Sequence, residues 1–323
     1  ESGPMAYESP DPGLPLTEDE EALLVFAACG ITGHALADLI YDQGAGGTIM
    51  AGLVGRTIPS GDAFQTCSLI VLNPEAAYYL KRPQDFLPEE IPGLIRLAEK
   101  EDYAEIYRRS RIRIGDGHTR PPVEPFFNLN CNRWSLYDPS ATYFLPVEDL
   151  TGLYINALLE VFNEHNGMYV LDERACFRAA GVKRFAQSRG GHLIDDPRDE
   201  HVITIQQLET LVTEFVTVEA GMMLQNLALM TQALGLGGFP HWAAHYYGWF
   251  EALGFQMTEV PASSYLGMGW LTRTIARLLK GDPPVPLVLG LEVDGETLIE
   301  PFCPPHYDPT KEAVHAVVEK KWG

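Results

Sequence analysis

The pattern of apolar and polar residues predicts five helices and four short strands. The first helix begins at Thr17, because a threonine followed by acidic residues at 18–20 fits a capping box, and it runs to about Gly30 or Gly33. A glycine-rich run at 235–238 ends a long apolar helix. The other predicted helices are Ile91–Arg109, Val147–Asn163, Thr204–Leu234 and Lys311–Lys321, and the predicted strands are Ser68–Leu72, Thr142–Leu145, Met168–Leu171 and Leu287–Leu291.

The order of these elements predicts an α+β architecture, because helices and strands are mixed without regular alternation. We expect a single domain over residues 1–323. Residues at about 75–135 are polar, proline-rich and weakly periodic, which predicts an insertion or a lid. The glycines between positions 44 and 55 predict an irregular, flexible segment.

The charge of the chain restricts its partners. A net charge of −21 over 323 residues argues against a general affinity for nucleic acid or for an anionic membrane, since both need a basic surface. No apolar stretch reaches membrane-spanning length. An anionic ligand would have to be held by a few local cationic or amide groups, working against the field of the whole molecule.

The cysteines and the N-terminal residues indicate a compartment. The five cysteines are an odd number, widely spaced and without a C-x-x-C pair, which predicts free thiols rather than disulfides or a zinc cluster. No basic region followed by an apolar run marks a secretory signal. We therefore expect a soluble, cytoplasmic protein.

A candidate ligand-binding stretch runs from Gly221 to Trp242. Its mostly apolar helix carries an amide pair, Gln225 and Asn226, and then breaks into glycines. Glycines let the backbone lie close to a flat ligand, and a buried amide can hydrogen-bond the edge of that ligand. The other interpretation is a core helix with a glycine C-cap. The residues of the break are Gly235, Leu236, Gly237 and Gly238.

This stretch and an upstream segment together resemble the nitroreductase superfamily. A helix with Gln-Asn followed by Ala-Leu-Gly-Leu-Gly is similar to the helix and glycine loop that help to shape the FMN site there. The upstream Arg-Thr-Ile-Pro-Ser-Gly-Asp-Ala at 56–63 is similar to the Arg-(Ser/Thr)-x-Pro-Ser-x-Gly-Ala segment of the azoline-oxidising peptide dehydrogenases. The first helix also resembles the opening of that branch, whereas Asp62 departs from its pattern.

The resemblance implies a nitroreductase-like fold, in which a central, mainly antiparallel sheet is flanked by helices. It also implies non-covalent FMN and a homodimer with the flavin near the interface. Arg56 is the candidate for a phosphate or pyrimidine contact, because a guanidinium forms planar, bidentate hydrogen bonds and stays charged. A surface arginine before a turn is the other interpretation. The implied cofactor-binding residues are Arg56, Thr57, Pro59, Ser60, Gly61, Gln225, Asn226, Gly235, Leu236, Gly237 and Gly238.

A basic cluster at 108–113 is the competing phosphate site. Its Arg-Arg-Ser is similar to the element that opens many nitroreductases, and Asn130–Trp134 would then take the place of a later element of that family. The alternatives are that these arginines offset local acid at a solvated helix end, or that Arg109 recognises an anionic substrate.

The segment His241–Phe250 could bind a metal or a flat substrate. His241 and His245 are one helical turn apart, which suits a metal, but no glutamate lies between them. We prefer an aromatic wall for the substrate, including Trp242, Tyr246 and Trp249, with the two histidines as candidate proton donors.

These observations predict an FMN-dependent oxidoreductase that transfers hydride between a reductant or substrate and a small or peptide-like acceptor. For a reductase the electron donor would be NAD(P)H, whereas in a dehydrogenase the substrate itself would reduce the flavin. Two alternatives stay open: a flavin-free binding or partner module on the same scaffold, and a histidine-dependent metal enzyme.

Overall fold

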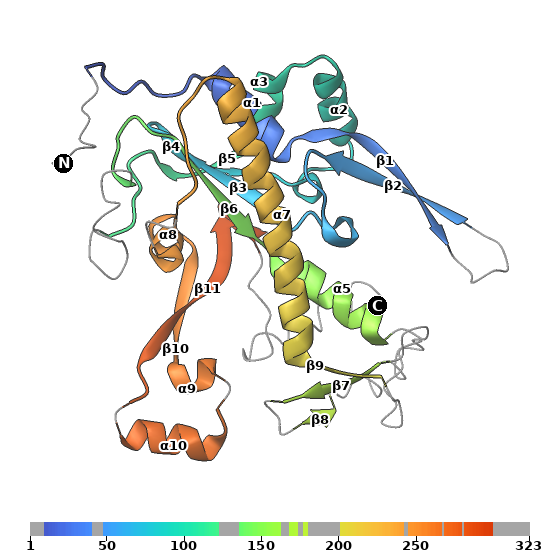
Figure 1. The fold of residues 1–323 in the computed structure, drawn as a ribbon, viewed down its shortest axis with the longest axis vertical. Helices are drawn as coiled ribbons and strands as arrows, with labels where there is room; N and C mark the ends of the chain where they lie inside the picture. Colours follow the sequence, from blue (N-terminus) through green and yellow to red (C-terminus); the bar gives the residue numbers. More distant parts are fainter. Residues whose placement is uncertain are drawn as a thin grey trace. The chain divides into compact units, whose positions relative to one another are not determined.

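The computed structural model describes residues 10–40, 48–122, 136–162, 168–173, 177–179, 201–241, 245–266, 268–279 and 281–299 (Figure 1). Over these residues the chain is mixed α+β with mainly antiparallel sheets, as predicted at this level. The chain divides into two compact units, and the single domain predicted over 1–323 stays a prediction. Unit 1 comprises Glu1–Thr57, Leu69–Pro146 and Gln225–Leu253, and unit 2 comprises Ile58–Ser68, Val147–Leu224 and Gly254–Gly323.

Unit 1 is built around a four-stranded sheet. The strand order is β5-β4-β3-β6, and both β3–β4 and β4–β5 are antiparallel. Every residue of β3 is buried, which agrees with the apolar run at 69–72. The strands are β3 (Cys67–Leu72), β4 (Ala76–Leu80), β5 (Arg111–Asp116) and β6 (Tyr143–Glu148), of which the first residues of β3 and the last of β6 fall in unit 2.

The segment predicted as an insertion or lid contributes directly to this sheet. Strands β4 and β5 lie within it, separated by η2 (Pro83–Asp85) and the helices α2 (Ile91–Glu99) and α3 (Tyr103–Ser110). Residues 76–116 of this segment therefore supply two strands of the sheet, and the interpretation of about 75–135 as an insertion or lid stays a prediction. The single helix predicted over Ile91–Arg109 is broken at Glu101, where φ is +60°.

The N-terminal part of unit 1 is a helix followed by a long hairpin. Helix α1 (Glu18–Cys29) begins with the predicted capping box, in which Thr17 Oγ1 accepts from Glu20 N at 3.3 Å and Glu20 Oε2 accepts from Thr17 N at 2.7 Å. Strands β1 (Ile31–Ile40) and β2 (Thr48–Arg56) then pair antiparallel. The prediction of an irregular segment between 44 and 55 is therefore wrong over 48–55.

Unit 2 has one core of two helices and a small sheet. Helix α5 (Leu150–Phe162) and the first turns of α7 (Ile205–Ala233) pack with β7 around Leu153, Val170 and Leu208. Strand β7 pairs antiparallel with β8 and parallel with β9. The predicted strand at Met168–Leu171 is thus confirmed as β7. These strands are β7 (Tyr169–Asp172), β8 (Arg178–Ala179) and β9 (Val202–Thr204).

A second part of unit 2 is a three-stranded antiparallel sheet in the order β10-β11-β12. Two short helices connect β10 to β11 and lie at the end of that hairpin (Figure 1). The predicted strand at Leu287–Leu291 is confirmed within β11. The elements are β10 (Gln256–Pro261), α9 (Ala262–Tyr265), α10 (Trp270–Leu278), β11 (Pro284–Val293) and β12 (Glu296–Ile299).

None of the helices in the described part of the chain combines the length and the hydropathy needed to cross a lipid bilayer. Cys29 and Cys67 are buried free thiols, in agreement with the prediction for these two. The helix predicted at Lys311–Lys321 and the candidate element Asn130–Trp134 lie outside the described residues.

Candidate functional site

Arg56 and Thr57 are fixed against the end of α1. Arg56 is the last residue of β2, and its Nε donates a hydrogen bond to Cys29 O at 3.0 Å. Thr57 N donates to Gly30 O, also at 3.0 Å. The capped helix and the hairpin therefore hold this pair in place, and the Arg56 guanidinium is half-buried rather than free on the surface.

The structure brings the two predicted motifs together. Asn226 Nδ2 donates a hydrogen bond to Thr57 O at 3.1 Å, although 169 positions separate them. Both residues belong to unit 1, because its third segment begins within α7. Gln225, the other residue of the amide pair, is exposed. The juxtaposition of the Arg56–Thr57 pair with Asn226 is what a shared site for the two motifs requires.

The Thr57 hydroxyl is buried without a partner. Within the described residues, Thr57 Oγ1 makes no hydrogen bond. A buried polar atom in this state costs about 1–3 kcal/mol, so it is rarely retained without a reason. This buried hydroxyl belongs to the same residue whose main-chain carbonyl accepts the hydrogen bond from Asn226.

The glycine-rich end of α7 closes the helix as predicted. Leu236 N donates to Thr231 O at 2.9 Å and Gly235 N donates to Gln232 O at 3.1 Å, which is a Schellman motif. Gly235 has φ +70°, the left-handed conformation that this motif needs. A Cβ atom at Gly235 or Gly237 would meet nothing within 4 Å, so the backbone here is open. Leu236 is half-buried and Gly238 is exposed.

The residues that follow Thr57 in the predicted motif belong to unit 2. Ser60 Oγ accepts a hydrogen bond from Gln65 N at 2.7 Å and thereby closes a turn. Pro59 is exposed, and Gly61 begins the short helix η1 (Gly61–Ala63). This arrangement accounts for the Pro-Ser pair by local structure. The assignment of Pro59, Ser60 and Gly61 to a cofactor site stays a prediction.

The basic cluster is neutralised by carboxylates. Arg109 Nε lies 2.8 Å from Glu105 Oε1, and Arg108 bonds both Glu105 and Glu18. Arg111 also lies 2.9 Å from Glu18 Oε1. These contacts favour the interpretation in which the arginines offset local acid at the end of α3. A substrate role for Arg109 stays a prediction.

The histidines have different surroundings. His245 is the N-cap of α8 (Tyr246–Ala252), where its Nδ1 accepts from Tyr247 N at 3.3 Å. Burial lowers the pKa of His241 below its ordinary value. The role of His241 and His245 as proton donors stays a prediction. No group of three or more potential metal-ligating side chains occurs among the described residues.

The aromatic wall is described in part. The rings of His245 and Tyr246 stack with centroids 4.6 Å apart, and Tyr246 is exposed. The ring centroids of Trp249 and Tyr143 of β6 are 6.0 Å apart, so Trp249 packs on the sheet of unit 1. Trp242 lies outside the described residues. The exposed Tyr246 is therefore the best-described candidate for stacking on a substrate.

A buried carboxylate in α1 was not predicted from the sequence. Glu21 of α1 is 3% exposed and accepts hydrogen bonds from Asn73 Nδ2 and Tyr107 Oη at 3.0 Å each and from Thr142 Oγ1 at 3.2 Å. Burial raises the pKa of Glu21, and these three hydrogen bonds oppose the rise. Its carboxylate is the centre of a buried hydrogen-bond network that joins α1, α3 and the sheet. The one signal in the sequence was the acidic first turn, which does not distinguish a buried glutamate from exposed ones.

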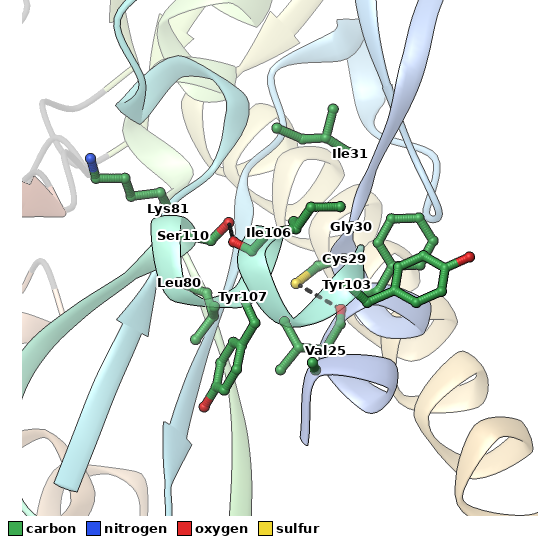
Figure 2. Close-up of a pocket in the computed structure, with 12 residues that line it drawn as sticks. Val25, Cys29, Gly30, Ile31, Leu80, Lys81, Tyr103, Ile106, Tyr107 and Ser110 are labelled. Carbon is green, nitrogen blue, oxygen red and sulfur yellow. Dashed lines mark hydrogen bonds between the residues drawn. The ribbon is translucent and has the colours of Figure 1, made fainter. Parts of the chain in front are cut away.

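A small pocket opens beside Cys29, between α1, α3 and β4 (Figure 2). Its lining is mainly apolar, and the Ser110 hydroxyl is already used in a hydrogen bond to Ile106 O at 2.7 Å. Cys29 Sγ contacts Val25 O at 3.6 Å, and burial raises the pKa of this thiol. A protonated, buried thiol is a poor nucleophile, so Cys29 gives this pocket no reactive thiolate.

No protein-family model, curated protein or solved structure matches this chain.

Proposed function

We propose that this protein is an FMN-dependent oxidoreductase whose flavin contacts Arg56, Thr57 and Asn226. The observation that carries the proposal is the Thr57 hydroxyl, which is buried and has no hydrogen-bond partner among the described residues. A protein keeps such an atom at a cost in stability, and a ligand that accepts its hydrogen bond recovers that cost.

The donor set fits the pyrimidine edge of a flavin. That edge presents carbonyl oxygens and one N–H, so it needs donors and an acceptor side by side. The Thr57 hydroxyl supplies a donor, and the Asn226 amide oxygen supplies an acceptor while its nitrogen holds Thr57 O at 3.1 Å. The positive charge of Arg56 favours electron density on the neighbouring carbonyl.

The glycine end of α7 supports the same proposal. Gly235 and Gly237 present open backbone, which allows the close approach that a flat ring requires. When bound, FMN would supply the hydride chemistry. The chain would bind and orient it, and exposed Tyr246 would offer a surface for a flat small-molecule or peptide-like substrate.

Replacing the hydroxyl separates this function from a structural role. In Thr57→Val an unpartnered hydroxyl becomes a methyl group of similar size. We expect the flavin-free protein to be stabilised by about 1 kcal/mol, because an unsatisfied polar atom is removed, and FMN to bind about 10-fold more weakly. Thermal unfolding of the flavin-free protein and FMN titration followed by flavin fluorescence measure the two effects.

The control is Thr217→Val, at an exposed position of α7 where the hydroxyl donates to Thr213 O at 2.7 Å. It makes the same chemical change away from the site and should leave FMN affinity within about 2-fold. A folded wild-type protein that takes up no FMN, even at high micromolar concentration, would contradict the proposal and favour a flavin-free module.

A further inference from the structure

Helix α10 turns its apolar side outward. Trp270 and Leu278 are each 78% exposed, whereas Arg273 and Ala276 are half-buried. At 100° per residue, Leu271, Ile275 and Leu278 share one face of this helix. Arg273 is held on the opposite side, because its Nε donates to Met268 O at 2.6 Å.

This orientation is the reverse of that expected for a surface helix. A helix on a monomeric soluble protein packs its apolar face inward and leaves arginine in water. Helices α9 and α10 form the end of the β10–β11 hairpin (Figure 1), and α10 has no buried residue. The exposed apolar face of α10 therefore requires a cover.

A second exposed apolar surface lies on α7. Its stripe consists of Leu211, Phe215, Val218 and Met222, all exposed and spaced four, three and four residues apart. This spacing is that of a helix–helix seam. The buried face of the same helix is a different one, which packs in the core of unit 2 through residues such as Leu208 and Val212. The stripe thus takes no part in that core of unit 2.

The two surfaces are complementary in charge. Helix α7 carries glutamates and no lysine, arginine or histidine, and exposed Glu214 borders its stripe. Helix α10 carries Arg273 and Arg277 and no acidic residue of its own, and Arg277 Nε lies 3.8 Å from Asp282 Oδ2 beyond the end of the helix. An acidic helix with an apolar stripe and a basic helix with an apolar face are suited to pack together.

We propose that α10 of one copy of this chain packs on the α7 stripe of a second copy, with Arg277 facing Glu214. Both surfaces belong to unit 2 and their apolar residues are exposed, so each copy offers one of each. Exchanging them between two copies gives a closed, twofold dimer in which both are buried. The proposal rests on these surfaces and does not depend on flavin binding.

Mass measurement of the full chain tests the arrangement. Size-exclusion chromatography with light scattering should give a dimer for the wild type. Leu278→Glu on α10 and Phe215→Glu on α7 should each raise the dimer dissociation constant by at least about 10-fold. Thr272→Glu, an exposed change of the same kind outside the apolar face, should leave the mass unchanged. Circular dichroism verifies that each variant is folded.

A charge exchange tests the pairing of the two helices. Arg277→Glu should weaken the dimer, and adding Glu214→Arg should restore it. Three results would overturn the proposal. The first is a wild-type protein that is monomeric at all concentrations. The second is a dimer that is lost in Phe215→Glu but kept in Leu278→Glu, because α7 would then pair with itself. The third is a monomer that binds phosphatidylcholine–phosphatidylglycerol vesicles through Leu278, because the apolar face would then be a lipid-binding surface.

Discussion

Two arginine-bearing segments of unit 1 compete for an anion, and they differ in what surrounds the charge. In the cluster at 108–113, Arg108, Arg109 and Arg111 contact carboxylates of Glu18 and Glu105. Arg56 donates to a main-chain carbonyl, and the residue that follows it, Thr57, carries a buried hydroxyl without a hydrogen-bond partner among the described residues. In a strongly acidic chain, a run of arginines is more readily explained by local neutralisation than by ligand binding. A single arginine beside an unsatisfied polar atom is the stronger candidate.

The largest expected effect separates the two segments directly. Arg56→Ala removes a charged donor from the proposed site, so FMN affinity should fall about 10- to 100-fold. Arg109→Ala breaks an exposed ion pair and should change FMN affinity by less than about 2-fold. Flavin fluorescence titration of both variants measures the difference.

Arg56 also bonds Cys29 O, so its loss could act through the fold. Arg56→Lys keeps the charge but not the planar fork, and we expect it to recover part of the affinity. If FMN affinity were unchanged in Arg56→Ala but lost in Arg109→Ala, the comparison would be reversed. The FMN phosphate would then bind at the basic cluster of residues 108–113.

The next effect concerns the glycine end of α7. Gly235→Ala puts a side chain at φ +70° and should destabilise the protein by about 1 kcal/mol. Gly237→Ala is the matched control, because its site is equally open but has no positive φ, and it should cost less. Urea denaturation curves of the two variants give the difference. Equal stability of the two variants would show that the end of α7 is not fixed by this motif.

The smallest expected effect is a change in the pH dependence of folding stability. The pKa of Glu21 is raised in the folded protein, chiefly by burial, so folding favours its protonated form. The resulting stability is fully present below the ordinary pKa of 4.5 and is lost as pH rises through the raised value. Glu21→Gln should remove this loss of stability, so the stability of the variant should rise relative to that of the wild type between pH 4.5 and 7.

Thermal unfolding midpoints across that range measure the gain. Glu20→Gln, one position away on the same helix, should differ from the wild type in the opposite direction, because the hydrogen bonds from Thr17 lower the pKa of Glu20. A constant difference in stability between Glu21→Gln and the wild type at all pH values would contradict a raised pKa of Glu21 in the folded protein.

Local signals in the sequence predicted much of this structure. The capping box at Thr17, the apolar run of β3 and the glycine stop of α7 depend on neighbouring residues, and all three are confirmed. The hairpin β1–β2 was missed, because the glycines of β2 at positions 52 and 55 read as breakers while pairing with β1 overrides their weak strand preference. Strands β4 and β5 were also missed, since a sheet partner selects them rather than their own sequence.

The candidate site was predictable in its parts and not in its chemistry. The motifs at Arg56–Thr57 and Asn226 were both identified in the sequence, and a hydrogen bond joins them. The unpartnered state of the Thr57 hydroxyl, the neutralised arginines and the burial of Glu21 depend on distant residues. No local pattern encodes those contacts.

The buried hydroxyl of Thr57 also bears on protein engineering. A redesign guided by stability alone would replace Thr57 with valine, and thermal screening would score that change as an improvement. If the proposed function is correct, the same change would erode cofactor retention, so the most stable version of this chain would be the least useful one. Variants chosen for heat resistance should therefore be screened for bound flavin before they are adopted as expression standards.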